Sequence, residues 1–275
     1  MIIMKCLIVI LLSFLVVAPL QANTDAWNDY LHVLNNFYTL DQQNFSSISC
    51  KIEVPIINNN LSQIHSQFSQ FRDKIVIKEN LATFSLIYRK SGGLTIYYPS
   101  LDIRIISEKG IADPAKVRKG IEMVKTGFKQ QVEGVGEQLK GIFEGFETPK
   151  KNHYKMEEVK NDNSVYTVKY EKDNSHFTEI YSDNQRKVIV VDSNGGKISS
   201  IENYEKAPNG KLVPRNAHVT IDQPMAKMEM DLSISYEELK AIYFPTHVAS
   251  HFNQSIQTMR QEGQVDIFLK NCTLK

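Results

Sequence analysis

The stretch Met228-Glu-Met-Asp-Leu-Ser-Ile-Ser-Tyr236 decides the fold, because apolar and polar residues alternate along it without interruption. Strict alternation predicts a β-strand with one buried face and one exposed face. Further strand-like runs lie on both sides of it, from 165–170 to 264–269, and Gly, Asn and Pro residues separate them. Strands at this spacing are typical of a meandering antiparallel sheet. We expect this sheet to be open or to curl toward a barrel.

The first part of the chain mixes helical and strand patterns. Helical spacing of apolar residues begins at Trp27, and Thr24 or Asp25 can cap that helix. A half-buried strand follows at 47–54, and Asn58-Asn59-Asn60 are expected to form a turn before a second, short helix. Three more strands are expected, the first two joined by a turn with two glycines; these runs are 83–88, 94–98 and 101–107.

One long helix is expected between the two blocks of strands, as an insert over 113–149. Asp113 followed by Pro114 is typical of a helix start. An apolar stripe continues from there to Phe146, and glycines recur beside it every seven residues. This helix is predicted either to cover the sheet as a lid or to be a plain packing helix. The proposed lid residues are Val117, Ile121, Val124, Phe128 and Val132.

The first 22 residues are typical of a secretory signal peptide. Lys5 precedes a short apolar run from Cys6 to Val17, and Ala22 offers a small residue for cleavage. The run is shorter than the roughly 20 apolar residues of a membrane-spanning helix. We therefore expect residues 23–275 to form a single exported domain in the periplasm; the alternative is an uncleaved N-terminal anchor.

Charge and cysteine content narrow the remaining classes. The chain has 32 basic and 31 acidic residues, so it lacks the basic excess of a nucleic-acid-binding protein. After cleavage two cysteines remain, Cys50 and Cys272, and both fall in strand-like segments. In an oxidising compartment these two residues can form one disulfide, and the alternative is two buried thiols.

No catalytic or cofactor motif stands out in the sequence. It has no nucleophile elbow, phosphate loop or metal-binding pair of cysteines. His247 and His251 lie four residues apart without a nearby third ligand, and residues 192–196 are explained by a hairpin turn. We therefore expect no enzyme activity, no resident metal and no cofactor; a secreted hydrolase with dispersed catalytic residues is the last alternative.

A curled sheet has a concave face, and the alternation makes one apolar face continuous. Methionines on it would form a lining that adapts to ligands of different shape. The alternative is an ordinary core packed against the helices. The residues predicted to line a cavity are Phe84, Leu86, Tyr88, Leu94, Ile96, Tyr98, Met228, Met230, Leu232 and Ile234.

The order of these segments resembles the LolA/LolB-like superfamily of periplasmic lipoprotein carriers and outer-membrane lipoprotein-sorting proteins. The similar segments are the signal peptide, the opening helix, the strand 45–54, the meander with Gly195-Gly196 and Asn209-Gly210, and the stretch 234–248. The resemblance implies an α+β fold, an antiparallel, strongly curled open β-barrel (half-barrel) whose concave face is covered by helices. It also implies that the cavity holds acyl chains.

The function expected from these observations is a periplasmic carrier that holds lipid or lipoprotein acyl chains in an apolar half-barrel. The resemblance adds envelope transport proteins and a transient contact with a membrane as partners, and we expect a monomer that binds no nucleic acid. The alternative is a structural or sensor domain of the same fold, which binds a protein partner and no lipid.

Overall fold

The computed structural model describes residues 24–149, 151–182, 185–192, 195–223, 226–256 and 259–275. The expected signal peptide, residues 1–22, lies outside them. The described residues form two compact units. Unit 1 comprises Phe45–Phe143 and Asp266–Lys275, and unit 2 comprises 24–44 and Glu144–Val265.

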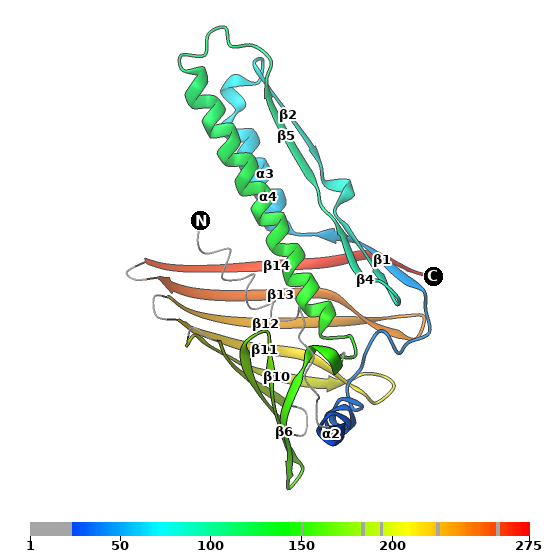
Figure 1. Cartoon of the computed structure of the whole chain (residues 1–275). Coiled ribbons are helices and arrows are strands. Elements are labelled where there is room, and N and C mark those ends of the chain that lie inside the picture. The colour runs from blue at the N-terminus through cyan, green and yellow to red at the C-terminus, as the bar shows by residue number, and fades with distance from the viewer. Residues whose placement is uncertain (1–23, 150, 183–184, 193–194, 224–225, 257–258) are drawn as a thin grey trace. The chain divides into compact units, whose positions relative to one another are not determined.

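The fold is α+β, as expected, and is dominated by antiparallel strands (Figure 1). Twelve strands follow the open order β4-β3-β1-β14-β13-β12-β11-β10-β9-β8-β7-β6. Unit 2 contains β6 (Lys155–Asp162), β7 (Val165–Lys172), β8 (Ser175–Ser182), β9 (Gln185–Val191), β10 (Lys197–Lys206), β11 (Leu212–Gln223), β12 (Ala226–Leu239), β13 (Ile242–Ile256) and the first part of β14 (Met259–Leu274).

Tight turns connect the strands of unit 2 into a meander. Asp173 and Asn174, between β7 and β8, both have positive φ angles, of 51° and 60°. Positive φ at two consecutive residues is the feature of the two-residue turns that match the twist of paired strands, and Asp and Asn tolerate it better than most residues. The expectation that residues such as Asn separate the strands is therefore confirmed at this position.

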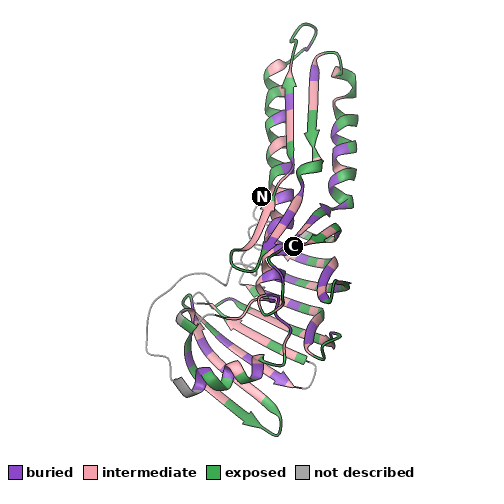
Figure 2. Cartoon of the chain, turned by 90° about the vertical axis from the view of Figure 1, so that its right-hand side faces the viewer, coloured by how far each residue is buried: buried purple, intermediate pink, exposed green. Residues whose placement is uncertain are grey.

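Register in unit 2 sorts the side chains of β11, β12 and β13 onto two faces. Met230 on β12 pairs with Val219 on β11 and with Phe252 on β13. The next residue, Asp231, pairs with His218 and His251. Because successive side chains point to opposite faces, one face is apolar and the other polar. Figure 2 shows the alternation as bands of buried and exposed residues along the strands.

Helix α2 (Thr24–Leu34) packs on one end of the unit 2 sheet. Its buried residues form a cluster with side chains on β6, β7 and β8 and with partly buried residues on β9. The cluster comprises Ala26, Trp27, Tyr30, Val33, Tyr154, Met156, Val168, Tyr170, Phe177 and Tyr181. We call this part of unit 2 the closed half.

Unit 1 contains the first strands of the order: β4 (Gly93–Tyr97), β3 (Ser85–Arg89), β1 (Ser47–Glu53) and the end of β14. A disulfide joins Cys50 on β1 to Cys272 on β14, so the expected bond is present. The register shifts between Ser49 and Lys51, and Asn271 has a φ of 52°. This irregularity accommodates one extra residue opposite Cys50.

Unit 1 also contains a second, two-stranded sheet and two helices. The sheet pairs β2 (Ile75–Asn80) with β5 (Ser100–Ile105); the sequence pattern did not predict β2. Helix α3 spans Pro55–Gln67, and short 3₁₀ turns follow at Ser69–Phe71 and Leu81–Thr83. The asparagine turn expected at 58–60 is wrong, because α3 already begins at Pro55. Proline is well suited to a first helical turn, where its missing N–H leaves no bond unmade.

Helix α4 (Pro114–Glu144) is the long helix expected from the sequence. A hydrogen bond from Asn60 of α3 to Gln131 joins the two helices of unit 1. The glycines of α4 differ in their surroundings: a Cβ at Gly120 or Gly127 would meet nothing within 4 Å, whereas one at Gly136 would clash with the Tyr98 side chain. The close approach that glycine permits is therefore present at Gly136 and absent at the other two.

Within the described residues, no helix is both long enough and apolar enough to cross a membrane.

Candidate functional site

A buried carboxylate lies in the closed half of unit 2. Glu179 on β8 is 4% exposed and accepts hydrogen bonds from three tyrosine hydroxyls. Tyr30 of α2 donates over 3.2 Å, Tyr170 of β7 over 2.9 Å, and Tyr181 of β8 completes the set. Buried polar groups are stable when they are hydrogen-bonded in this way. These bonds also tie α2 to the sheet.

A second charged group adjoins this cluster. Arg186 on β9 is paired in register with Tyr181 and with Glu202 on β10. Its guanidinium contacts the Glu202 carboxylate over 3.0 Å, and Tyr204 donates to the same carboxylate over 2.6 Å. Burial acts to lower the pKa of Arg186, but the neighbouring acidic groups, Glu202 first and Glu179 among them, together outweigh it, so this pKa is raised. The arginine therefore keeps its positive charge between two carboxylates.

Burial raises the pKa values of the tyrosines in this region well above their ordinary value, and the charge of Glu179 raises them further for Tyr30, Tyr170 and Tyr181. These hydroxyls therefore stay protonated and act as donors. By contrast, burial lowers the pKa of Lys172 to about 8. A carboxylate saturated by donors and screened from water makes a poor base or nucleophile. The network is suited to holding α2 in place rather than to chemistry on a substrate.

The apolar face of the sheet continues beyond the closed half, on β11, β12 and β13. We call this region the open half, because the α2 cluster ends at Val188 and Val190 of β9. Its apolar face carries four of the residues expected to line a cavity: Met228, Met230, Leu232 and Ile234. Met228 and Ile234 are buried, and the other two are half-buried.

Two neighbouring residues shape this apolar face. The ring of Phe252 on β13 lies so close to Gly263 of β14 that a Cβ at that position would be less than 3.0 Å from it. Gln254, the register partner of Met228, is 2% exposed, and its Oε1 has no hydrogen-bond partner among the described residues. An unpaired buried acceptor is unfavourable by itself. It can accept a hydrogen bond from a molecule that binds beside it.

The other six residues predicted to line a cavity lie in unit 1. Phe84, Leu86 and Tyr88 are buried, whereas Leu94, Ile96 and Tyr98 are half-buried. Tyr88 stacks on Phe143 of α4 with 5.6 Å between ring centroids. These contacts are those of a packed core, and a role in lining a cavity stays a prediction.

The residues predicted to form a lid share one stripe of α4 in unit 1. Ile121, Phe128 and Val132 are buried, and Val117 and Val124 are half-buried. Three of the five residues are thus buried in the folded chain. A lid would have to move, and the structure gives one position of α4. The interpretation of α4 as a lid therefore stays a prediction.

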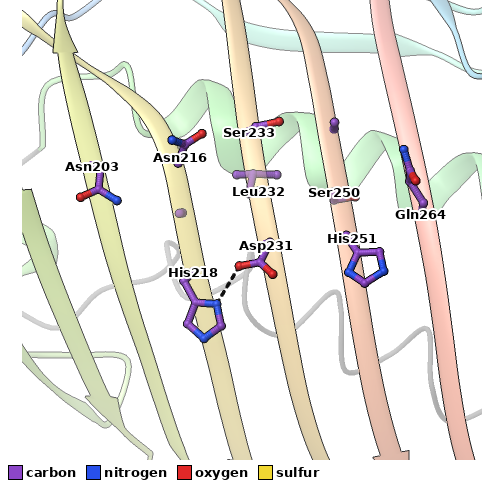
Figure 3. A pocket seen from close by; sticks show the side chains of 11 residues that line it. Asn203, Asn216, His218, Asp231, Leu232, Ser233, Ser250, His251 and Gln264 are labelled. Atoms are coloured by element: carbon purple, nitrogen blue, oxygen red, sulfur yellow. Dashed lines mark hydrogen bonds and ion pairs between the residues drawn. The ribbon is translucent and has the colours of Figure 1, made fainter.

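The polar face of unit 2 bears a shallow pocket of about 540 Å³ (Figure 3). It is lined by His218, Asp231 and His251, which are neighbours in register, and His218 contacts Asp231 at 2.7 Å, whereas His251 contacts Glu262, outside the lining, at 2.9 Å. All four side chains are exposed. Among the described residues, no group of three or more His, Cys, Asp or Glu side chains could hold a metal ion. Of the predicted lining residues, Leu232 also borders this pocket, although it is in phase with Met230 on the apolar face.

No protein-family model, curated protein or solved structure matches the chain.

The sequence reasoning missed the two polar features that distinguish the halves of unit 2. The first missed feature is Glu179, which lies between Thr178 and Ile180 on a short strand. The second is Gln254, which lies between two other polar residues. A signal was present for Glu179, because it is in phase with Phe177 and Tyr181, both apolar in character. A charged residue in phase with a buried face predicts a buried, paired charge.

Proposed function

We propose that this protein binds an acyl chain on the apolar face of the open half of unit 2, as a carrier of lipid or of lipoprotein acyl chains. The observation that carries the proposal is the continuation of this face past the α2 cluster. Val219, Met230 and Phe252 form one row across three strands, and Ile221 and Met228 begin the next. Burying methylenes is worth about 0.8 kcal/mol each, so a long chain could bind without specific polar contacts.

The unpaired Oε1 of Gln254 supports a ligand with a donor near one end of the chain. A hydroxyl, a protonated carboxyl or an N-acyl amide offers such a donor. A ligand with a donor can form a hydrogen bond to this buried acceptor. A ligand without a donor leaves the acceptor unpaired, so it should bind more weakly. The proposed ligand class is therefore an acyl chain with a donating head, rather than a hydrocarbon.

The disulfide supports a location outside the reducing cytosol, since such bonds persist in oxidising compartments. The periplasm is the compartment we propose. A half-barrel, in which the sheet curls around the acyl chain, also remains part of the proposal. The binding experiment depends neither on the periplasmic location nor on the half-barrel.

The proposal is tested by titrating the purified protein with a fluorescent fatty acid. Met230→Asp places a charge on the apolar face, and Ser233→Asp places the same charge on the polar face of the same strand. We expect saturable binding by the wild type and by the Ser233 variant, and at least about tenfold weaker binding by the Met230 variant. Equal affinity of the two variants, or no binding by the wild type, would contradict the proposal.

The alternative is a structural or sensor domain with a filled core. The packing of Tyr88 on Phe143 in unit 1 and the closed half of unit 2 favour it. It predicts no fatty-acid binding by the wild type, so the same titration separates the two functions.

A further inference from the structure

A basic segment with exposed apolar side chains lies in unit 1, at the end of β5 and the start of α4. Residues Arg104–Lys129 include seven basic and three acidic residues, an excess of four positive charges. The rest of the chain has 25 basic and 28 acidic residues, the 32 and 31 of the whole chain less these. Positive charge is therefore concentrated here, in a chain that is otherwise slightly acidic.

The two most exposed large apolar residues of the described chain lie in the same segment. Ile106 is 63% exposed and Met123 is 68% exposed. The other large apolar residues that are exposed, such as Val191 and Ile201, range from 36% to 45%. Single exposed apolar side chains are common, but two at this level within one basic segment call for an explanation.

Local contacts fix the backbone around Ile106. The backbone N–H of Ile106 donates to the carbonyl of Lys74 over 2.7 Å, which fixes its backbone beside β2. Glu108 forms an ion pair with Arg118 of α4, and buried Ile111 anchors the loop between them. The exposure of Ile106 is thus set by a bonded framework.

Met123 projects from a bare face of α4. Gly120 and Gly127 lie three residues before it and four residues after it, on the same side of the helix. A Cβ at either glycine would meet nothing within 4 Å. Lys116 and Lys119 continue this face toward the helix start. The face therefore combines an uncovered apolar side chain with lysines.

Some basic residues of the segment form ion pairs and others do not. Arg104, Arg118, Lys125 and Lys129 each have a carboxylate partner. Lys109, Lys116 and Lys119 form no ion pair among the described residues. Unpaired lysines beside exposed apolar side chains are the combination that binds anionic phospholipid surfaces, because the lysines attract the headgroups and the apolar groups enter the interface.

We propose that the basic segment, residues 104–129, docks on an anionic phospholipid bilayer. Ile106 and Met123 insert at the level of the headgroups, and Lys109, Lys116 and Lys119 neutralise lipid charge. A membrane is favoured over an acidic protein because the two apolar side chains are separate projections rather than a continuous patch. The proposal goes beyond acyl-chain binding in unit 2 and does not depend on it.

The test is co-sedimentation of the whole protein with vesicles of phosphatidylglycerol and phosphatidylcholine, compared with phosphatidylcholine alone. We expect binding to the anionic vesicles and little to the neutral ones, with binding reduced by salt. Ile106→Ser with Met123→Ser should weaken binding about tenfold or more. Lys109→Glu with Lys119→Glu should weaken it by a comparable factor, since each basic residue contributes about fivefold.

Matched controls on unit 2 are Val191→Ser with Ile201→Ser, and Lys187→Glu with Lys197→Glu. These should bind as the wild type does. The altered residues are exposed, so circular dichroism of every variant should be unchanged. Equal binding by segment and control variants, equal binding to neutral vesicles, or no binding at all would overturn the proposal. Displacement from vesicles by soluble polyglutamate at equal charge would also overturn it and would indicate an acidic protein partner.

Discussion

The closed and open halves of unit 2 share the same alternation of apolar and polar residues, but they differ in what covers the apolar face. In the closed half, α2 covers the apolar face, and both oxygens of the buried Glu179 carboxylate accept hydrogen bonds from tyrosine hydroxyls. In the open half the apolar face carries two methionines and a buried glutamine with an unpaired oxygen. Satisfied polar groups thus accompany the part of the sheet that α2 covers. The unsatisfied one lies where we propose that a ligand binds.

The largest effect should come from alkaline pH, which acts on buried tyrosines at and beside the closed half. Tyr30, Tyr170, Tyr181 and Tyr204 have pKa values raised above 10 in the folded protein. Above pH 10 the unfolded chain releases protons that the folded protein keeps, so unfolding becomes more favourable as pH rises. Each such tyrosine contributes up to about 1.4 kcal/mol per pH unit.

Denaturant unfolding at pH values from 10 to 11, followed by circular dichroism, measures this loss of stability. Lys172, with its pKa lowered to about 8, acts in the opposite direction up to about pH 10.5, so the scan is repeated with Lys172→Met. Tyr30→Phe should reduce the slope by about one proton. Phenolate absorbance that develops in the folded protein without loss of stability would show that these tyrosines are accessible.

Truncation of a large side chain should have a much greater effect in the closed half. Phe177→Ala removes a buried ring stacked 4.8 Å from Tyr170 and should lower the free energy of unfolding by about 4 kcal/mol. Met230→Ala removes a half-buried side chain from the open half and should lower it by about 1 kcal/mol. Urea unfolding measures both. Similar losses for the two variants would mean that the open half is an ordinary core.

Removal of the buried carboxylate tests whether the network fastens α2. Glu179→Leu leaves three buried hydroxyls without an acceptor and should cost about 3 kcal/mol in urea unfolding. Adding Tyr181→Phe removes one of these hydroxyls and should recover part of the loss. A stable Glu179→Leu variant would mean that the hydroxyls find other partners and that the network contributes little.

The smallest effect is expected at Gln254. Gln254→Leu removes the unpaired buried oxygen and should raise the free energy of unfolding by about 1 kcal/mol. The variant should bind an acyl chain but lose any preference for a fatty-acid amide over the methyl ester. Gln185→Leu on β9, where the amide is exposed and bonded to Asn203, is the control and should not stabilise. Loss of stability at Gln254 would show that its amide is paired in solution.

Much of this fold could be predicted from local patterns. The alternation from Met228 to Tyr236, the helix start at Asp113-Pro114 and the turn at Asp173-Asn174 each act over a few residues, so the sequence alone predicts them. The pairing of Cys50 with Cys272 could be proposed from the compartment, but the two bonded strands are 222 residues apart in sequence. Only the strand order shows that they are neighbours.

The rest depended on contacts between distant segments. Strand β2 was missed because its pairing with β5 is long-range and its second half is polar. Glu179 was missed because its acceptor role needs Tyr30, 149 residues away. The proposed site raised a similar difficulty: Met230 reads equally well as core or as lining. What distinguishes the two is the extent of the α2 cluster, which no local pattern encodes.

The most direct test of acyl-chain binding is native mass spectrometry of the protein expressed with its own N-terminal segment and purified without detergent. We predict a population with the added mass of a lipid or fatty acid in the wild type and in Ser233→Asp, and its absence in Met230→Asp. A single apo mass for the wild type, together with no uptake of a fluorescent fatty acid, would contradict the account.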